Sequence, residues 1–335
     1  MAHKTSFKIF GTGHYLPNNL VYSTDLDAKL GLTPGVIERK SGVSRRFFVS
    51  ENENAAEMGA KAATLAVQEA GLTLSDIDCI VACSATMDQG LPCNAALLHE
   101  ALGLGRSGIP ALDVNASCLG FVAAIDMLRW QLAHERYKRV LLVASDIASC
   151  GLNWENLESS AIFADGAAAA VVGPAGDNST SGILASKLAT WSSGAHVCEI
   201  PAGGSRYHPS RIPQGGFEPL TKFHMNGKKV FRLAAEHFDE FLAVLLDEAA
   251  VTMSDIDLIV PHQASQLGLQ HMVKRLNISP SLVVNIFSEY GNQVAASLPT
   301  ALDVAVQSKR IKRGQTVLLI GTGAGLSIGG VVMEY

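Results

Sequence analysis

Two stretches of the chain repeat one order of apolar and polar residues. Residues 69–81 read Glu-Ala-Gly-Leu-Thr-Leu-Ser-Asp-Ile-Asp-Cys-Ile-Val, and residues 248–260 read Glu-Ala-Ala-Val-Thr-Met-Ser-Asp-Ile-Asp-Leu-Ile-Val. Each stretch has the pattern of a helix end, a polar loop and an apolar strand buried on both faces. Each follows a segment with Ala and Leu at helical spacing, which predicts amphipathic helices at about 54–70 and 228–250. A repeat of this length indicates an internal duplication.

Two shorter parallels support the duplication. Residues 137–145 and 313–321 are basic turns that lead into a Leu/Val strand, and residues 169–173 and 329–333 are short apolar strands. Both halves thus alternate strands with helices, a pattern that predicts mostly parallel sheets with right-handed crossovers. The predicted fold class is α/β, a duplicated layered sandwich with two mostly parallel mixed sheets.

The predicted halves are 1–174 and 175–335, because a turn-rich stretch follows Pro174. One segment breaks the alternation of strands and helices. Residues 192–227 are rich in Gly, Pro, Ser and His and have little periodicity. A loop this long in a compact domain is more often functional than idle, so we expect it to form a cap over a substrate channel.

Composition and charge exclude several classes of protein. The 335 residues are 48% apolar and carry a net charge of −5, which gives no general attraction to nucleic acid or to an anionic membrane. The longest candidate for a membrane span, 118–133, is interrupted by Asp126 and Arg129. The first residues lack the apolar region of a secretion signal, and the six cysteines are scattered. These features predict a soluble protein of the cytoplasm.

Cys118 is the first candidate for chemistry. An apolar strand ends near Val114, and an apolar helix begins around Cys118 and continues through Phe121. At such a strand-to-helix turn, free N–H groups and the helix dipole favour a thiolate and can bind a developing oxyanion. The alternative is a small buried hydrophobe, which is how the other five cysteines are interpreted.

Two further residues occupy comparable positions in the second half. His262 follows the strand 256–261, at the carboxyl end where α/β proteins place ligands; the alternative is a structural histidine. Asn292 lies in a turn before a small-residue helix, as an approximate counterpart of the Cys118 turn. The alternative for Asn292 is an ordinary helix N-cap. The duplication predicts that the two turns meet about a pseudo-twofold axis.

The glycine-rich run 321–330 resembles a nucleotide-binding loop, but no helix follows it and no acidic residue lies downstream. A turn that brings backbone N–H groups to a reacting carbonyl explains it better. A metal site is not expected either, since Cys79, Cys83, Cys93 and His99 lack a paired Cys-x-x-Cys spacing.

The motifs Asn-Ala-Ser-Cys-Leu-Gly-Phe, Pro-His-Gln-Ala-Ser, Tyr-Gly-Asn-Gln-Val-Ala-Ala-Ser and Gly-Thr-Gly-Ala-Gly resemble the β-ketoacyl-ACP synthase III branch of the thiolase superfamily. The resemblance extends from Gly11 to Tyr335. It implies a thiolase-like fold, a homodimer and no cofactor. The substrates it implies are an acyl-CoA or acyl-ACP donor and malonyl-ACP or malonyl-CoA.

The resemblance also implies a mechanism. Cys118 accepts an acyl group, with the backbone N–H groups of Cys118 and Ala324 as the oxyanion hole. His262 and Asn292 then hold the malonyl carbonyl while carbon dioxide leaves, and the carbanion attacks the acyl-enzyme. The glycines Gly323 and Gly325 belong to the turn that surrounds the reacting carbonyl.

Some positions depart from the family pattern. Val36 and Lys40 stand where many members have a Trp and an Arg that hold the coenzyme A nucleotide, and Ser265 and Leu267 replace a frequent Asn and a basic residue. By analogy, Leu91 is expected to complete the pocket of a neighbouring subunit. Four residues form a possible docking patch for an acidic carrier protein, with a solvated helix face as the alternative: Lys228, Arg232, Lys274 and Arg275.

The leading prediction is a decarboxylating condensing enzyme. A second is an acyltransferase that moves the acyl group from Cys118 to a hydroxyl or amine without decarboxylation. A third is an inactive subunit of a heterodimeric synthase, which the complete Cys118, His262 and Asn292 set disfavours. The sequence leaves open the primer, its length, its carrier and the pathway.

Overall fold

The computed structural model describes residues 4–213 and 215–335, and it contains two large sheets. In spatial order, the first consists of β2 (Lys8–Tyr15), β8 (Gly166–Gly173), β7 (Val140–Asp146), β5 (Cys79–Ala82) and β6 (Ala111–Asp113). The second consists of β1 (Thr5–Ser6), β9 (Gly182–Thr190), β14 (Ser327–Glu334), β13 (Thr316–Gly323) and β12 (Leu258–Pro261). The smaller elements are β3 (Asn19–Tyr22), β4 (Arg45–Phe48), α1 (Ser23–Lys29), α2 (Val36–Ser41), α6 (Leu157–Ser160) and α9 (Phe287–Tyr290).

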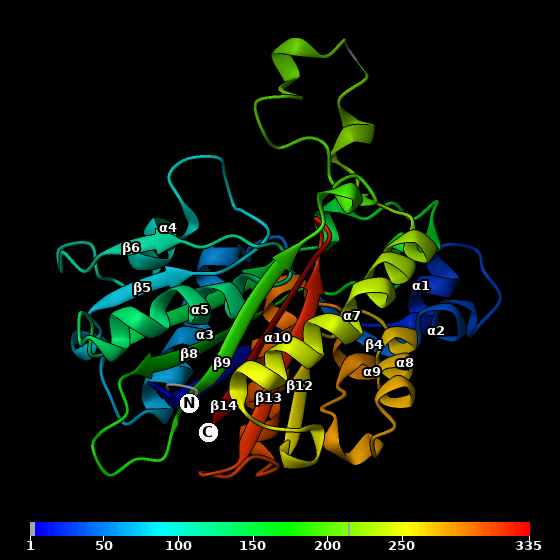
Figure 1. Ribbon diagram of the computed structural model, residues 1–335. Helices are drawn as coiled ribbons and strands as arrows, with labels where there is room; N and C mark the ends of the chain where they lie inside the picture. Colours follow the sequence, from blue (N-terminus) through cyan, green and yellow to red (C-terminus); the bar gives the residue numbers. More distant parts are fainter. Residues whose placement is uncertain (1–3, 214) are drawn as a thin grey trace.

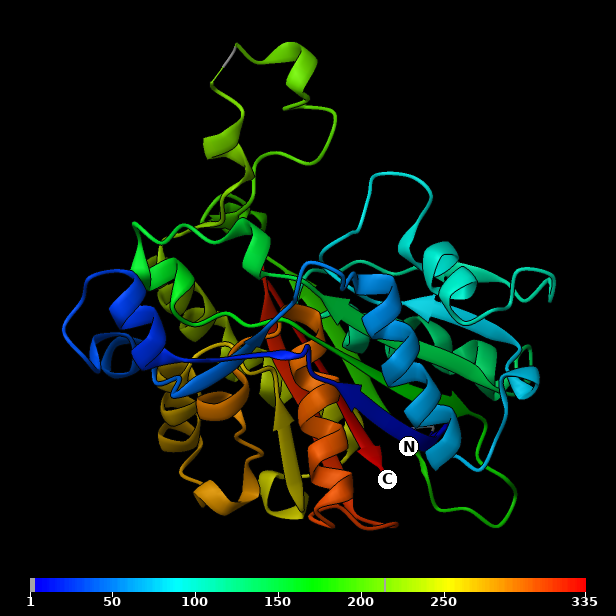
Figure 2. The same cartoon turned by 180° about the vertical axis from the view of Figure 1, so that it is seen from behind.

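Helices fill three layers around the two sheets (Figures 1 and 2). Between the sheets lie α5 (Gly120–Ala133) and α10 (Ser297–Gln307), and their apolar side chains form the largest core cluster together with strand residues of both sheets. Outside the first sheet lies α3 (Ala55–Glu69), followed by α4 (Asn94–Ala101). Outside the second sheet lie α7 (Gly227–Ala249) and α8 (Gln266–Leu276). The layered α/β prediction is confirmed, and α3 and α7 match the predicted amphipathic helices.

The prediction of mostly parallel sheets is wrong. The parallel pairs are β7–β5 and β5–β6 in the first sheet and β12–β13 in the second. The strands that close each half run antiparallel, β8 beside β7 and β14 beside β13. The reason is the connection: β13 reaches β14 through a short turn, which reverses the chain where a helical crossover would keep its direction.

The duplication is visible in the structure. The order β2–β8–β7–β5 corresponds to β9–β14–β13–β12. The repeated loop also has one geometry: the N–H of Thr73 donates to Asp76 at 2.8 Å, and the N–H of Thr252 donates to Asp255 at 2.8 Å. The halves exchange elements, however, because the N-terminal β1 pairs with β9 of the second sheet.

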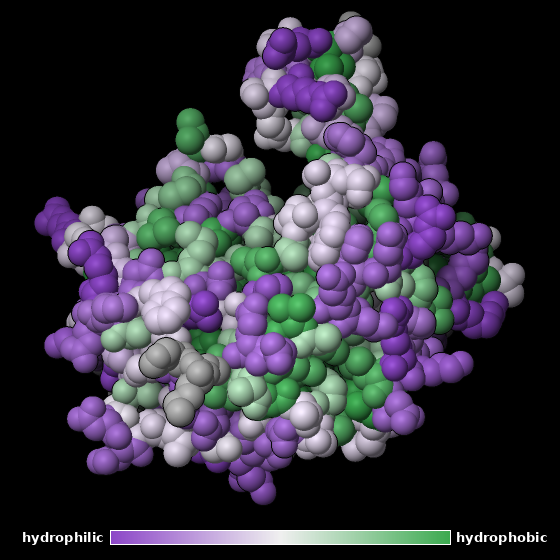
Figure 3. Space-filling view, in the orientation of Figure 1, coloured by the Kyte–Doolittle hydropathy of each residue, from purple (hydrophilic) through white to green (hydrophobic). Residues whose placement is uncertain are grey.

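The segment predicted as a cap has two parts. Its base is a two-stranded ribbon of β10 (Cys198–Glu199) and β11 (His224–Met225), extended by a hydrogen bond from the N–H of Ala202 to the carbonyl of Leu220 at 2.9 Å. The described residues between them, 200–213 and 215–223, project away from the body of the molecule (Figure 1). In Figure 3 their surface mixes hydrophilic and hydrophobic side chains. Only the base therefore lies near the layered body, where a cap was expected.

In the described part of the chain, no helix is both long enough and apolar enough to span a bilayer.

Candidate active site

Cys118 lies in the turn between β6 and α5, two residues before the helix begins. Ser117 has a left-handed backbone with a φ of 53°, and its N–H donates to the side-chain oxygen of Asn115 at 2.9 Å. A side chain at Gly120 would collide with the carbonyl oxygen of Cys83, so only glycine allows the helix to start this close to β5. The left-handed residue directly before the thiol is an unfavourable conformation of the kind that clusters at functional sites.

The end of β13 packs directly on the Cys118 turn. A Cβ at Gly321 would lie 2.7 Å from the Cβ of His262 and 3.2 Å from the Cδ2 of Leu119, and one at Gly323 would lie 3.2 Å from the carbonyl oxygen of Ala116. These glycines therefore let β13 pass between His262 and the turn that carries the thiol.

The Cys118 thiol is protonated at neutral pH. Burial raises its pKa to about 12, and the nearby Cys198 and Asp146 act in the same direction. Hydrogen bonds from the backbone N–H groups of Ala324 and of Cys118 itself act against them. Burial therefore outweighs any effect of the helix start on the pKa of this thiol, and Cys118 itself precedes the helix by two residues. The two N–H groups at the sulfur are nevertheless those expected for the oxyanion hole.

His262 directly follows β12, and its N–H donates to the carbonyl of Ile320 at 2.8 Å. The residue is 5% exposed, and its Nδ1 has no hydrogen-bond partner within residues 4–213 and 215–335. Burial lowers the pKa of His262 to about 4. The imidazole is therefore neutral at physiological pH, and one of its two nitrogens carries a hydrogen.

The Asn292 side chain has a fixed orientation. Its Oδ1 accepts from the N–H of Val294 at 2.9 Å and from Oγ of Ser297 at 3.3 Å, so the opposite atom is the amide nitrogen. That Nδ2 donates to the carbonyl of Ala264 at 3.2 Å, and the N–H of Ala264 donates in turn to the carbonyl of His262 at 2.9 Å. An amide nitrogen has two hydrogens, so one N–H remains for a ligand.

A cavity of about 230 Å³ reaches His262 from the outer face of the second sheet. Apolar side chains of α7 and α8 dominate its lining, including Phe231, Phe238, Leu269 and Met272. Ser265, whose Oγ caps α8 by accepting from the N–H of Gly268 at 3.1 Å, lies on its wall. In the sequence these apolar residues have the helical spacing of an ordinary core, which does not indicate a cavity.

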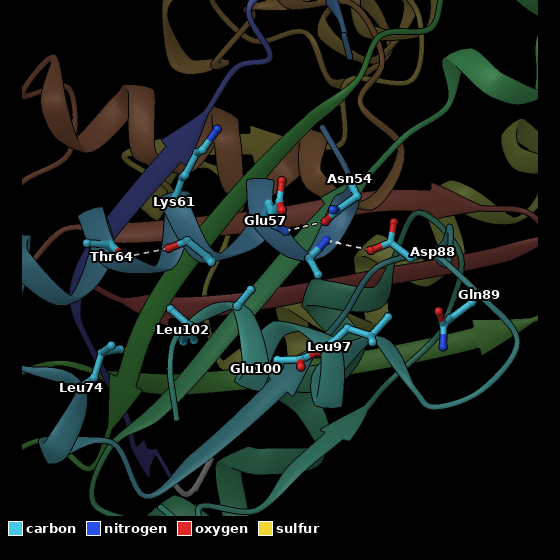
Figure 4. A pocket seen from close by; sticks show the side chains of 13 residues that line it. Asn54, Glu57, Lys61, Thr64, Leu74, Asp88, Gln89, Leu97, Glu100 and Leu102 are labelled. Atoms are coloured by element: carbon cyan, nitrogen blue, oxygen red, sulfur yellow. Dashed lines mark hydrogen bonds between the residues drawn. The ribbon is translucent and has the colours of Figure 1, made fainter. Parts of the chain in front are cut away.

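A larger hollow of about 810 Å³ lies elsewhere, between α3 and α4. Figure 4 shows Glu57 and Lys61 on α3, Asn54 at its N-cap and Glu100 on α4, all lining this hollow. None of the predicted catalytic residues lines it, and its helix-capping Asp88 already accepts from the N–H groups of Ala55 and Ala56 at 2.9 Å. Of these two cavities, the smaller one contains a predicted catalytic residue, His262.

The other predicted binding residues are spread over the surface. Lys40 is exposed at the end of α2, which approaches the start of α8, since a Cβ at Gly42 would lie 2.7 Å from the Cβ of Gln266. Leu91 is 87% exposed on the loop before α4, and Gly325, with a φ of 145°, lies in the turn between β13 and β14.

The four docking candidates lie on α7 and α8. Lys228, Arg232 and Lys274 are exposed. Arg275 donates to both carboxylate oxygens of Asp239 at 2.7 Å, so its charge is already paired. Among the described residues, no group of three or more His, Cys, Asp or Glu side chains is placed to hold a metal ion.

The fold and site define an acyltransferase with the thiolase fold. Two family models match the chain: 3-oxoacyl-[acyl-carrier-protein (ACP)] synthase III over residues 112–192, and its C-terminal part over 246–335. The chain belongs to the 3-oxoacyl-[acyl-carrier-protein] synthase III family.

Similar proteins cover almost the whole chain. It is 33% identical over 328 residues to the β-ketoacyl-[acyl-carrier-protein] synthase III of Neisseria meningitidis, which covers 98% of this chain and 99% of the relative. It is 34% identical over 326 residues to that of Chlamydia caviae, covering 97% and 96%. The crystal structure of 3-oxoacyl-[acyl-carrier-protein] synthase III from Aquifex aeolicus has a TM-score of 0.86 and 29% identity, covering 98% of this chain and all of that one.

Proposed function

We propose that the protein condenses an acyl group carried on Cys118 with a malonyl thioester and releases carbon dioxide. The observation that supports this most directly is the meeting of three groups from separate elements. The Cys118 turn and His262 flank Gly321, and the amide of Asn292 bonds to Ala264, two residues from the imidazole. A nucleophile and two neutral hydrogen-bond donors on adjoining segments suit acyl transfer followed by enolate stabilisation, and one of the donors, His262, lines the cavity.

In the first stage the Cys118 sulfur attacks the carbonyl carbon of an acyl thioester. The backbone N–H groups of Cys118 and Ala324 bind the resulting oxyanion. Because the thiol is protonated, its proton must leave as the carbon–sulfur bond forms, and it ends on the departing thiolate. The products are an acyl-enzyme and a free thiol of coenzyme A or of a carrier protein.

In the second stage a malonyl thioester occupies the cavity between α7 and α8. Nε2–H of His262 and the remaining N–H of Asn292 donate to its thioester carbonyl. Both groups are neutral donors. Their N–H groups stabilise the negative charge that develops as the carbon–carbon bond to the carboxylate breaks and carbon dioxide leaves. The enolate carbon attacks the acyl carbonyl, the bond to sulfur breaks, and a β-ketoacyl thioester departs.

Intact-protein mass spectrometry tests the first stage. Wild type is exposed to acetyl-CoA, butyryl-CoA and octanoyl-CoA, and we expect one acyl adduct per chain with at least one donor. Cys118→Ala is expected to form none. Cys198→Ala is the matched control, because this second cysteine lies close enough to influence Cys118 but is expected to leave labelling intact. Labelling of Cys118→Ala would overturn the assignment.

Carbon dioxide release from malonyl-CoA by the labelled enzyme separates condensation from simple acyl transfer. Release is expected to require Asn292 and His262. Transfer of the acyl group to a hydroxyl or amine acceptor without release would favour the acyltransferase alternative instead.

We also propose a homodimer without a cofactor, acting on thioesters in the cytoplasm. Exposed apolar side chains gather around β6, which is the edge of its sheet: Leu112 is 41% exposed, and Met87 and Leu91 on the neighbouring loop are 53% and 87% exposed. The six cysteines are free thiols, as in a reducing compartment. Lys228, Arg232 and Lys274 offer positive charge to an acidic carrier protein. Light scattering of wild type and of Leu112→Lys tests the interface.

A further inference from the structure

Arg46 is the largest completely buried side chain of the described residues, with 0% exposure. It lies on β4, outside both large sheets. Its guanidinium donates to the carbonyls of Ala161 and Phe163 at 2.6 and 3.2 Å and to Oγ of Ser23 at 3.0 Å. No carboxylate accepts from it in the described part of the chain. A buried cation paired only with neutral oxygens is costly, so its retention calls for a specific reason.

The carbonyls that Arg46 binds belong to the segment that holds Asn292. On this segment, the carbonyl of Ile162 accepts from the N–H of Asn292 at 2.8 Å, and the N–H of Ala164 donates to the carbonyl of Asn292 at 2.9 Å. Phe163 and Asn292 thus form an isolated parallel β-bridge. Arg46 thus binds the carbonyls of Ala161 and Phe163. The alternating residues, Ile162 and Ala164, bind the main chain of Asn292.

We infer that Arg46 is a positioning residue for Asn292. The guanidinium bonds to the strand-like segment 161–164, and this segment bonds to the main chain of Asn292. The segment belongs to no sheet, so its carbonyls would otherwise lack buried donors. A planar guanidinium with five N–H groups can hold carbonyls two residues apart in one orientation, which a lysine ammonium cannot do as rigidly.

The inference rests on the role of Asn292 in the proposed function, and it assigns Arg46 to one stage of the reaction. Asn292 serves the malonyl stage, whereas acylation of Cys118 depends on a different turn and on Ala324. Disturbing Arg46 should therefore slow decarboxylation and condensation and leave acylation unchanged. A general loss of structure would lower both stages together.

The test compares Arg46→Met with Arg45→Met. Arg45 precedes Arg46 on the same strand but is only partly buried and pairs with Glu289 at 2.6 Å, so it is a matched control. Acyl-enzyme formation is counted by mass spectrometry with the acyl-CoA that labels wild type. Carbon dioxide release from malonyl-CoA is then measured per labelled chain, which corrects for any unfolded fraction.

We expect Arg46→Met to form acyl-enzyme within about twofold of the wild-type rate and to lose roughly 10–100-fold in the malonyl stage, because a misplacement near 1 Å can have effects of this size. Arg46→Lys should recover part of the loss, and Arg45→Met should behave as wild type.

A parallel measurement on Asn292→Ala separates two kinds of failure. If Asn292→Ala loses the malonyl stage but Arg46→Met keeps it, or if Arg46→Met slows both stages equally, the positioning role is wrong. If Asn292→Ala itself keeps the malonyl stage, the proposed function is wrong instead. Should Arg46→Met not fold, Arg46→Lys provides the same ratio of the two stages.

Discussion

Two turns of the molecule, Asn115–Cys118 in the first half and Asn292–Ala295 in the second, have one backbone geometry. In each, the first residue is an asparagine whose Oδ1 accepts from the N–H two residues later, at 2.9 Å in both. That later residue is left-handed in both, with a φ of 53° at Ser117 and 55° at Val294. Positions 115 and 292 are as far apart as Val140 and Val317, the first apolar residues of the repeated Leu/Val strands.

The side chains on this shared geometry differ. Cys118 corresponds to Ala295, and the catalytic candidate Asn292 corresponds to Asn115, which sharpens the approximate match expected from the sequence. Asn115 is exposed, whereas Asn292 is 4% exposed and bonds through Nδ2 to Ala264. In the proposed mechanism, one turn therefore supplies the nucleophile and the other an amide donor. Duplication produced two equivalent supports, and each half uses a different position of the turn.

We expect the two turns to differ most when their asparagine side chains are removed one at a time. Asn292→Ala and Asn115→Ala each delete the same bond to a left-handed residue, worth about 1 kcal/mol. Only Asn292→Ala also deletes the free N–H beside His262. We expect it to reduce carbon dioxide release from malonyl-CoA by roughly 10²–10³-fold, as for loss of an oxyanion donor. Asn115→Ala should change release by no more than about threefold.

These rates are measured on acyl-enzyme, so that the first stage does not enter. Equal losses in the two variants would mean that the turn bond, and not the amide hydrogen, supports the reaction.

Buried ionisable groups beside the turns give a second, smaller contrast. His262 has a pKa near 4 in the folded protein and 6.5 as a free side chain. Below pH 6.5 the unfolded chain binds a proton that the folded one rejects, so stability falls as the pH is lowered from 6.5 to about 4. The difference in pKa corresponds to a loss on the order of 3 kcal/mol. In urea unfolding, wild type should lose this stability between pH 6.5 and about 4, whereas His262→Gln should not.

Asp146 should show the opposite sign. Burial raises its pKa from 3.8 to about 6, although it accepts from the N–H groups of Ala85, Thr86 and Ala296. Between these values the folded protein binds the extra proton, so this group adds stability as the pH falls from 6 towards 3.8. Asp146→Asn should therefore lose stability more steeply with acid than wild type. Parallel curves for all three proteins would contradict both assignments.

The sequence predicted the features that are repeated or local. The duplication, α3, α7 and the placement of Cys118 between strand and helix follow from periodicity and from the paired motifs. Family membership followed from motifs in order along the chain. The direction of β8 and β14 did not follow, because it depends on how the chain connects them.

Properties that depend on tertiary surroundings were not predictable. The protonated state of Cys118 results from burial by segments distant in sequence. Arg46 gave no signal, since an arginine next to another arginine is typical of an exposed strand. The cavity at His262 arises because α7 and α8 face each other with small gaps between apolar side chains. In the sequence, the apolar stripe of such a helix is the same whether the gap is empty or filled.

The smallest expected contrast concerns the left-handed residues themselves. A residue with a side chain in this conformation is strained by about 1–2 kcal/mol, and glycine relieves that strain but adds freedom to the unfolded chain. We expect Ser117→Gly to raise the free energy of unfolding by about 0.5–1 kcal/mol. Val294→Gly should gain less, because the half-buried valine also loses apolar contacts.

Lys309→Gly provides the control, since Lys309 is exposed, has a φ of 58° and lies outside both turns. It should gain stability like Ser117→Gly without changing either stage of the reaction. Ser117→Gly, in contrast, should slow acylation several-fold, because the thiol then sits on a looser turn. If Ser117→Gly gained stability and acylated at the wild-type rate, the left-handed residue would be a remnant of the duplication that the chemistry does not need, and the common geometry of the two turns would reflect ancestry alone.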